Sequence, residues 1–332
     1  MGTVELSLQE IGDLARRVFS ENGCDAENTD ALVRTIVTAE RDGSHSHGLF
    51  RLPGYIASLR SGKVNGNARP KVAMKTLAIV SVDGDNGYAP LAIERGVPAL
   101  ADAAKKLGVA VMATTHTHHF AALWPETEAI AGQGLIGIAC VCYTPLVAPA
   151  GGKKSLFGTN PISFAWPRPG RSPVVVDMAT ASMALGEVQI AARDGRTVPL
   201  GTGLDANGAL TTDPNEILKG TLLPFGGYKG SAIALMVELL AAGAVGESFS
   251  FEAAEADIKD GGPPRGGEFM LAISPELLAG PGWAEHSEEF FRRFDAIEGA
   301  RLPGSRRQHN RLSLAPRNID ATLLERIHAL CN

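Results

Sequence analysis

The chain has 332 residues, 45 % of them hydrophobic and 20 % charged, with 31 Lys and Arg against 36 Asp and Glu. This length allows more than one packed lobe. The net charge of −5 argues against nucleic acid or an anionic membrane as partner, because both require an excess of clustered cations. The 38 glycines predict many tight turns, which are more typical of enzymes than of scaffolds.

The cysteines give no disulfide or metal framework. Cys140 and Cys142 lie in one apolar run, where strand alternation places both on the same face, and no second ligand pair accompanies them. We therefore expect buried thiols. No signal peptide or membrane-length apolar run is present in the sequence, so a cytoplasmic location is expected.

The first half of the chain predicts two helices followed by a strand–helix–strand unit. Ser7 can cap a helix that Gly23 ends, and a second helix is expected over 27–42. Strands at 76–84 and 108–115 flank a helix at about 90–107. Neither a G-x-G-x-x-G turn nor a phosphate-binding G-x-x-x-x-G-K-[ST] loop occurs, so any nucleotide must bind without them.

The second half predicts further strands and one unusually apolar helix. The segment 231–246 is apolar nearly all round and predicts a buried helix, and 254–268 is the best candidate for a mobile loop. The remaining predicted strands are 134–143, 161–166, 173–178 and 267–274, and the remaining helices 282–298 and 318–330.

The segment DGSHSHGLFR, from Asp42 to Arg51, is the strongest candidate for chemistry. It follows a predicted helix and combines two serines with two histidines. Histidine is the side chain best suited to move protons near neutral pH. Arg51 lies four residues after His47, and its planar guanidinium suits a substrate carboxylate. The alternative is a polar helix end whose histidines are only structural.

A second cluster, TTHTHHFAALWPE at 114–126, ends a predicted strand. Alternation would place His116 and His118 on one face and His119 on the other. A zinc site is conceivable, but no matching H-E-x-x-H or cysteine set is present, so we favour a loop that contacts a cofactor or substrate.

Three more segments offer groups for anion or cofactor binding. Thr159 lies in the turn FGTNP, and Asp177 ends an apolar strand, where an unpaired carboxylate is costly. Glu187 either starts a helix or orients His47.

The segment LLPFGGYKG brings Lys229 to the start of a helix, where an anion can bind. RLPGSRRQHNR, at 301–311, holds four arginines suited to a phosphate or to a solvated basic face.

Six motifs follow one another along essentially the whole chain: DGSHSHG-x-x-R, HFAALWP, FGTNP, VVDMAT, LLPFGGYKG and RLPGSRR. Together they resemble the malate/L-lactate dehydrogenase-like oxidoreductase family. The pattern is most similar to bacterial Δ1-piperideine-2-carboxylate/Δ1-pyrroline-2-carboxylate reductases. The resemblance implies NADPH-dependent reduction of a cyclic imino acid to L-pipecolate or L-proline. It also implies a homodimer. From the histidine and cysteine spacing discussed above, we expect no metal.

The resemblance implies roles for particular residues. His47 would donate a proton, with Ser46 and Glu187 as its relay partners, and Arg51 would bind the substrate carboxylate. Cofactor contacts would come from His119, Phe120, Ala121, Ala122, Leu123, Thr159, Asp177, Met178, Ala179, Tyr228, Lys229, Arg301, Leu302, Pro303, Gly304, Ser305, Arg306 and Arg307. A carboxylate near His47 would favour its imidazolium form.

One position departs from the family pattern. His-Gly-Asp is replaced here by Leu185-Gly186-Glu187, which keeps the carboxylate with one more methylene. Hydroxy-acid members of the family tend to carry Lys at this position, so an acid favours the imine branch.

The fold implied is α/β, with a mixed, largely antiparallel, non-Rossmann nucleotide-binding sheet, an N-terminal helical region and a second α/β lobe. We expect a first lobe with the Ser-His motif over 1–115, an NADPH-binding domain over 116–298 and a returning C-terminal segment over 299–332. The nearest alternative function is a 2-oxo acid or 2-hydroxy acid dehydrogenase acting on malate, lactate or ureidoglycolate-type substrates. More distant alternatives are a non-catalytic binding protein and a zinc hydrolase built on His116, His118 and His119.

Overall fold

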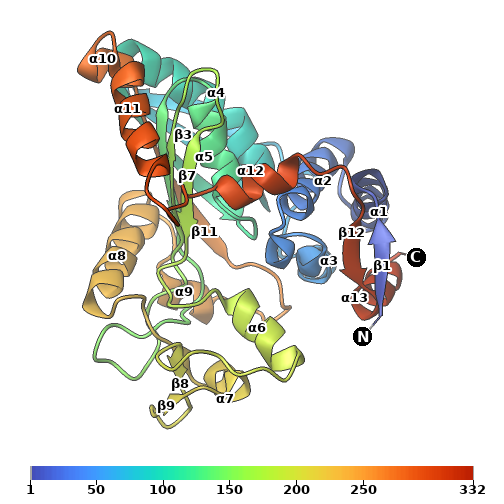
Figure 1. Cartoon of the computed structure of the whole chain (residues 1–332). Coiled ribbons are helices and arrows are strands. Elements are labelled where there is room, and N and C mark those ends of the chain that lie inside the picture. The colour runs from blue at the N-terminus through green and yellow to red at the C-terminus, as the bar shows by residue number, and fades with distance from the viewer. Residues whose placement is uncertain (1, 332) are drawn as a thin grey trace.

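A seven-stranded mixed sheet forms the centre of the structure, in the order β2-β3-β4-β11-β5-β6-β7 (Figure 1). The structure is a computed structural model and describes residues 2–331. Only the β3–β4 pair is parallel, and every other pair in this sheet is antiparallel. Its strands are β2 (Lys71–Thr76), β3 (Ile79–Tyr88), β4 (Val109–His118), β5 (Ile136–Val141), β6 (Ile162–Trp166), β7 (Val174–Met178) and β11 (Arg265–Ile273).

The predicted strand–helix–strand unit is confirmed. Helix α4 (Ala89–Leu107) connects the parallel strands β3 and β4 and packs its apolar side on them. Helix α5 (Trp124–Ala131) packs against the same face through Ile130. The opposite face is covered by α8 (Tyr228–Glu238) and the π-helical turn η3 (Leu239–Ala244), through Val237 and Ala241.

Helix α8 is less buried than its apolar sequence predicts. Leu235, Met236 and Leu239 are about half exposed, because only one side of α8 and η3 packs against the sheet. The prediction of a helix buried all round was therefore wrong. Cys140 and Cys142 are free, buried and packed together on this side of the sheet, as expected.

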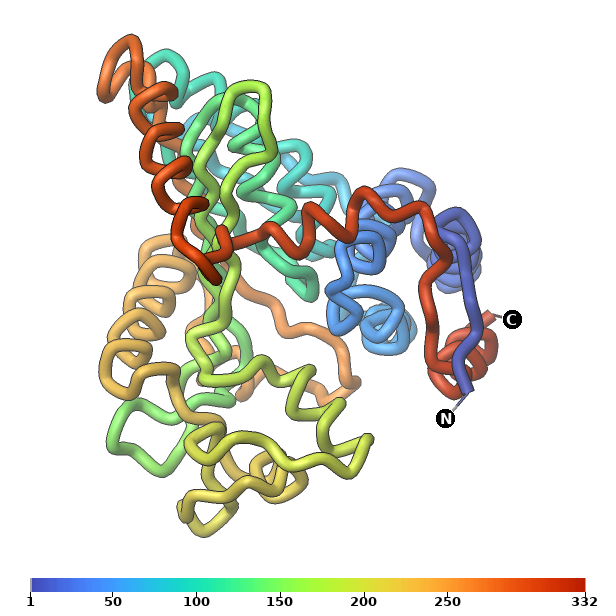
Figure 2. Tube along the Cα trace, viewed as in Figure 1, coloured from blue at the N-terminus to red at the C-terminus, as the bar shows by residue number. Residues whose placement is uncertain are grey.

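A helical region lies beside the sheet and holds both chain ends (Figure 2). Its helices are α1 (Leu8–Glu21), α2 (Ala26–Arg41) and α3 (Leu52–Arg60), with α13 (Ala321–His328) from the C-terminal end. Ser7 caps α1 with the reciprocal bonds of a capping box. Strand β1 (Thr3–Leu6) pairs with β12 (Arg317–Asp320), so the expected helix at 318–330 is really a strand followed by a shorter helix.

The other elements are short and surround this framework. They are the 3₁₀ turns η1 (His45–His47) and η2 (Leu49–Arg51), helices α6 (Leu185–Arg193), α7 (Pro214–Lys219), α9 (Ser250–Glu255), α10 (Pro275–Ala279), α11 (Trp283–Asp295) and α12 (Ser305–Arg311), and the small sheet of β8 (Gly203–Leu204), β9 (Leu210–Thr211) and β10 (Thr221–Leu222). The expected loop at 254–268 is shorter, since β11 begins at Arg265. Within residues 2–331 no helix is long and apolar enough to cross a membrane.

Helix α12 crosses from the sheet to α2 and returns the chain to the helical region (Figure 1). Asp42, fully buried just after α2, receives hydrogen bonds from Arg311 of α12, from Arg41 and from the indole Nε1 of Trp124 at 3.2 Å. Burial alone would raise the pKa of Asp42, but its arginine partners outweigh burial and hold the pKa below its usual value. Asp42 therefore ties the helical region, α12 and α5 together.

We expect Asp42→Asn to lower the free energy of unfolding by about 2–4 kcal/mol, because it leaves two partly buried guanidinium groups without their carboxylate. The depressed pKa means that the carboxylate stabilises the protein above its unfolded pKa and that this contribution is lost as the pH falls through the folded pKa. Urea unfolding at neutral and acid pH measures both effects.

The matched control is Asp30→Asn, which removes an exposed ion pair with Arg16 and should cost less than about 1 kcal/mol. Equal losses in the two variants would show that Asp42 does not hold these elements together.

Candidate active site

A cavity of about 510 Å³ opens where β4, β5 and β7 end and β6 and β11 begin. Residues from the DGSHSHG segment, the loop after β4, the turn before β6, the end of β7, helix α6 and helix α12 all face it. The lining residues are Gly43, Ser44, His45, Ser46, His47, Arg51, His119, Phe120, Ala121, Ala122, Leu123, Trp124, Val141, Tyr143, Leu146, Thr159, Pro161, Asp177, Met178, Ala179, Ala184, Leu185, Gly186, Glu187, Ile190, Arg306 and Arg307.

The DGSHSHG segment forms two short 3₁₀ turns, and the buried side chain of Glu40 fixes them. Glu40 accepts one hydrogen bond from the Leu49 backbone N–H at 2.8 Å and lies 2.6 Å from His45 Nδ1. This hydrogen bond raises the pKa of His45. A Cβ at Gly48 would lie 2.0 Å from Glu40 Oε1, so glycine is required there. His45 thus holds the loop while Ser46 and His47 face the cavity.

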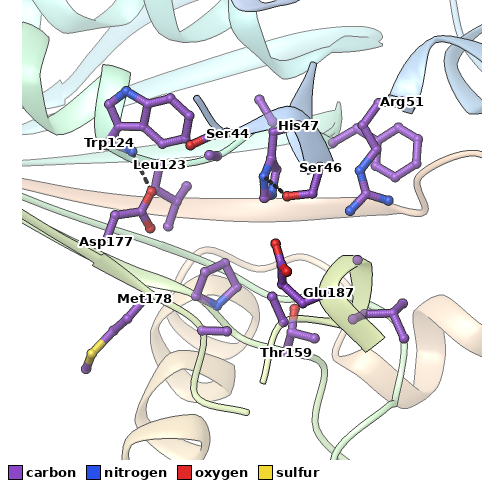
Figure 3. Close-up of a pocket in the computed structure, with 18 of the residues that line it drawn as sticks. Ser44, Ser46, His47, Arg51, Leu123, Trp124, Thr159, Asp177, Met178 and Glu187 are labelled. Atoms are coloured by element: carbon purple, nitrogen blue, oxygen red, sulfur yellow. Dashed lines mark hydrogen bonds between the residues drawn. The ribbon is translucent and has the colours of Figure 1, made fainter. Parts of the chain in front are cut away.

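Ser46 and His47 form the expected pair. Ser46 Oγ lies 3.1 Å from His47 Nδ1, and the two side chains stand together in the upper wall of the cavity (Figure 3). The imidazole also meets the Trp124 ring edge to face at 6.5 Å. These contacts fix the orientation of the ring. Its other nitrogen, Nε2, has no hydrogen-bond partner among residues 2–331 and can act on a ligand.

The charge of His47 differs from the expectation. Burial and the positive charge of Arg51 lower the pKa of His47 to about 3, with a smaller contribution from neighbouring His119. No carboxylate among residues 2–331 offsets these effects, so the imidazole is neutral in this pocket at neutral pH. The expectation that a neighbouring carboxylate favours imidazolium was wrong for the protein without ligand.

Arg51 is a partly buried guanidinium with no ion pair within the described part of the chain. Its guanidinium lies over the Phe120 ring at 4.6 Å, and its buried Nε has no hydrogen-bond partner. Burial lowers the pKa of Arg51, which means that its positive charge is held at a cost. A carboxylate ligand would satisfy both the charge and the free donors.

Glu187 approaches the Ser46–His47 pair from the opposite wall. It lies in the first turn of α6, is exposed, and points across the cavity toward Ser46 (Figure 3). In the structure, the Glu187 side chain makes no hydrogen bond to Ser46 or His47. The close approach is made by Gly186, where an added Cβ would lie 3.0 Å from Ser46 Cβ.

The turn that carries Thr159 is held from behind by Glu238 of α8. This buried carboxylate accepts hydrogen bonds from Asn160 Nδ2 at 2.8 Å and from the Ser250 backbone N–H at 3.1 Å. Asn160 itself has a left-handed backbone, with φ of 40°. These contacts fix Thr159 in the lower wall of the cavity.

Asp177 and the loop after β4 form the wall beside His47. Asp177 Oδ2 accepts the Trp124 backbone N–H at 3.1 Å (Figure 3), and burial raises the pKa of Asp177. This bond fixes the start of α5, and all five expected contact residues from His119 to Leu123 line the cavity. Met178 and Ala179 follow along the same wall.

The arginine segment is divided by the structure. Arg306 and Arg307 line the cavity, but Arg301, Leu302, Pro303, Gly304 and Ser305 do not. Arg307 stacks over the Trp124 ring at 5.1 Å and donates to the Val175 carbonyl, whereas Arg306 is exposed at the rim. Tyr228 and Lys229 are exposed and lie outside the set that lines this cavity.

The three histidines of the second cluster separate. His116 has a left-handed φ of 52° and turns to Asp83, His118 is buried against the Pro263 carbonyl and Asn86, and His119 meets Glu126. The left-handed residue breaks strand alternation, so His116 and His118 do not share a face as expected. A zinc site made by these three rings is therefore excluded.

Several pocket residues were not predicted. Tyr143, Leu146 and Pro161 flank the turn of Thr159, and Ile190 faces inward from α6. Tyr143 ends the predicted strand 134–143 and Pro161 ends the FGTNP motif, so their positions could have indicated them, whereas Leu146 and Ile190 look like ordinary apolar residues.

The cavity suits a nucleotide cofactor in size and chemistry. Its volume lies in the range of small-molecule sites. Arg307 Nε is buried without a hydrogen-bond partner among residues 2–331, next to the exposed Arg306. These donors fit a phosphate at the rim, while Asp177, Met178 and Thr159 form the inner walls.

The charge of His47 can be measured directly. In a histidine NMR titration, we expect the His47 ring to stay neutral far below pH 6, with a pKa of about 3, while His45 titrates above its usual value. Arg51→Met should raise the pKa of His47, because it removes a positive charge, and should leave His45 unchanged. A normal pKa of His47 in the unchanged protein would contradict the described pocket.

Comparison with known proteins gives consistent relatives. Residues 6–323 match the family model described as malate/L-lactate dehydrogenase. The chain is 46 % identical over 306 residues to the Δ1-pyrroline-2-carboxylate/Δ1-piperideine-2-carboxylate reductase of Pseudomonas syringae pv. tomato, covering 92 % of this chain and 89 % of the relative. It is 44 % identical over 314 residues to the Δ1-pyrroline-2-carboxylate reductase of Ancylobacter novellus, covering 93 % and 91 %.

Solved structures show the same fold. The Δ1-piperideine-2-carboxylate reductase from Pseudomonas syringae superposes with a TM-score of 0.93 at 45 % identity, covering 99 % of this chain and 100 % of the other. The sulfolactate dehydrogenase from Methanocaldococcus jannaschii gives a TM-score of 0.90 at 30 % identity, covering 99 % and 97 %.

Proposed function

The chain belongs to the malate/L-lactate dehydrogenase family, whose members imply a nicotinamide cofactor, and we propose that it reduces cyclic imino acids with NADPH. The substrates would be Δ1-piperideine-2-carboxylate, giving L-pipecolate, and Δ1-pyrroline-2-carboxylate, giving L-proline. The reductase relatives at 40–46 % identity support this choice over the 2-oxo acid alternative.

The observation that carries the proposal is the unpaired Arg51 beside Ser46 and His47. A small substrate with a carboxylate next to the reacting carbon satisfies the free guanidinium and brings that carbon close to the proton-transfer pair. The aromatic Phe120 under Arg51 and Tyr143 beside it leave room for a flat ring.

His47 is the proton donor in this proposal. NADPH, when bound, supplies hydride to C2 of the C=N bond, and a proton must reach the nitrogen. A bound substrate carboxylate offsets the positive charge of Arg51, which is one cause of the low pKa of His47. Substrate binding therefore raises the pKa of His47 and loads the acid only when it is needed. Ser46 holds Nδ1, and Glu187 closes the relay from α6.

The same proposal covers the cofactor, the assembly and the location. NADPH would lie along the mixed sheet, without a Rossmann glycine turn, with its 2′-phosphate at Arg306. Tyr228, Lys229 and residues 301–305 would contact it only after the walls move closer.

The division of the chain into domains after residues 115 and 298 stays a proposal, and the first of these limits falls inside β4. Residues 1 and 332 of the outer segments lie outside the described part. A homodimer and a cytoplasmic location are proposed with it.

We expect His47→Ala to lower kcat for the cyclic imines by roughly 100-fold or more while NADPH binding stays within about twofold, because His47 acts on the proton. Arg51→Met should mainly raise KM. His286→Ala, which alters an exposed histidine on α11, is the control and should behave as the unchanged enzyme. Full turnover in His47→Ala would remove its assigned role.

Cofactor choice is tested at the rim. Arg306→Ala should weaken NADPH binding by roughly tenfold and leave NADH binding nearly unchanged, because only NADPH carries the 2′-phosphate. The matched control is Arg293→Ala, which removes an exposed arginine of α11 outside the cavity and outside the proposed cofactor contacts. Equal losses for both cofactors would contradict a 2′-phosphate site at Arg306.

A further inference from the structure

Two glutamates are buried behind the cavity wall and touch one of its residues. Glu126 lies in the first turn of α5, and Glu268 lies in β11, between β4 and β5 in the sheet. They are 8 % and 1 % exposed, and His119, which lines the cavity, meets both. No role in the proposed function uses the two glutamates.

The contacts require a proton between the two carboxyl groups. His119 Nε2 lies 2.8 Å from Glu126 Oε1 and 3.9 Å from Glu268 Oε2. Glu126 Oε2 and both oxygens of Glu268 are buried without a donor from elsewhere in the described chain. Two facing carboxylates would repel each other, whereas a protonated carboxyl donates a hydrogen bond to its neighbour.

A metal ion is the other way to neutralise such a group, and the distances favour protons. The three side chains offer ligand atoms within 4.8 Å of one another. Two ligands of one zinc ion, each about 2.0–2.1 Å from it at a tetrahedral angle, lie more than about 3.2 Å apart. The 2.8 Å contact of His119 with Glu126 is instead a hydrogen-bond distance.

The charge states follow from burial. Burial raises the pKa of Glu126 to about 8 and that of Glu268 well above its usual value, and it lowers the pKa of His119. Both carboxyls are then protonated at neutral pH and the imidazole is neutral. Glu126 donates its O–H to Nε2, so His119 carries its own proton on Nδ1. That nitrogen has no partner in residues 2–331.

We propose that Glu126 and Glu268 store a proton behind His119 and that His119 passes it into the cavity, where it reloads the acid of the reduction. Glu126 and Glu268 are thus positioning residues that act through His119. The inference rests on the proposed function, because imine reduction consumes one proton for each hydride.

The transfer is balanced without any redox change. His119 Nδ1–H gives its proton to an acceptor in the cavity, which is neutral His47 once substrate is bound. At the same time the Glu126 O–H bond breaks, and its proton moves to Nε2. Glu126 is left as a carboxylate that accepts the Glu268 O–H bond. Solvent returns the proton through the open cavity after product leaves.

Other titratable groups surround this unit. Asp177 of β7 raises the pKa of Glu126, and Arg307 of α12 faces Asp177. On the remaining sides, Cys140 of β5 lies near Glu268, Tyr55 of α3 near Glu126, and His47 near His119. The pKa of Glu126 is about 8, so an alkaline limb near that pH that Glu126→Gln removes points to the store.

The stored proton is tested first without catalysis. Infrared difference spectra at pH 7 between the unchanged protein and Glu126→Gln or Glu268→Gln should contain a protonated carboxyl C=O band. Carboxylate bands alone would overturn the proposal. So would a stoichiometric metal ion in the purified protein that Glu126→Gln removes.

The relay is tested by the dependence of kcat on pH. The unchanged enzyme should lose activity as the pH rises above about 8, because Glu126 then loses its proton. Glu126→Gln should lower kcat roughly tenfold or more and abolish this alkaline limb, with NADPH binding unchanged. Glu126→Asp should restore part of the limb. All variants are assayed with the same substrate, so protonation of the substrate itself affects every pH profile equally.

Glu247→Gln is the matched control. Glu247 is also a buried glutamate beside a histidine, His116, but it lies outside the residues lining the cavity. It should keep the alkaline limb. Identical pH profiles for Glu126→Gln and the unchanged enzyme would overturn the relay. Absence of imine reduction by the unchanged enzyme would contradict the proposed function instead, and the infrared result would still decide whether the proton is stored.

Discussion

The buried carboxylate of Asp42 is the constraint on which the active site depends. It ends α2, directly before Ser46 and His47, and binds Arg311 of α12 and the Trp124 indole of α5. Trp124 in turn meets His47 with its ring, carries Arg307 on its face and donates its backbone N–H to Asp177. One carboxylate therefore sets the relative position of His47, the proposed proton donor, and the wall proposed to bind cofactor.

The pocket also contains a positive charge, that of Arg51, which has no carboxylate partner among residues 2–331. His47 stays neutral partly because of this charge. Such an arrangement costs stability in the protein without ligand and is repaid by an anionic ligand. The same low-polarity surroundings force protons onto Glu126 and Glu268. In the proposed reaction, burial thus links the charge of the substrate to the supply of protons.

The sequence could predict elements whose signals are local. Ser7 caps its helix as expected, and local sequence patterns located β3, α4 and β4, because capping and periodicity depend on neighbouring residues. Pairings between distant segments could not be predicted in this way. Nothing local indicates that β12 pairs with β1, or that β11 enters between β4 and β5. The left-handed backbone of His116 likewise depends on its tertiary contacts.

The candidate site shows the same division. The motifs identified Ser46, His47, Arg51 and the loop from His119 to Leu123, all of which line the cavity. The motifs did not predict the support behind them. Glu40, Glu238, Glu126 and Glu268 are single carboxylates in helices or strands, where sequence alone suggests a solvated surface. Their burial arises only when elements far apart in the sequence pack together.

The most direct test of the account compares steady-state kcat/KM with NADPH for Δ1-piperideine-2-carboxylate, Δ1-pyrroline-2-carboxylate and pyruvate. We expect at least one cyclic imine to exceed pyruvate by roughly 100-fold in kcat/KM, a ratio expected when a site is built for one reacting group. Pyruvate reduced as efficiently as both imines, or neither imine reduced, would contradict it.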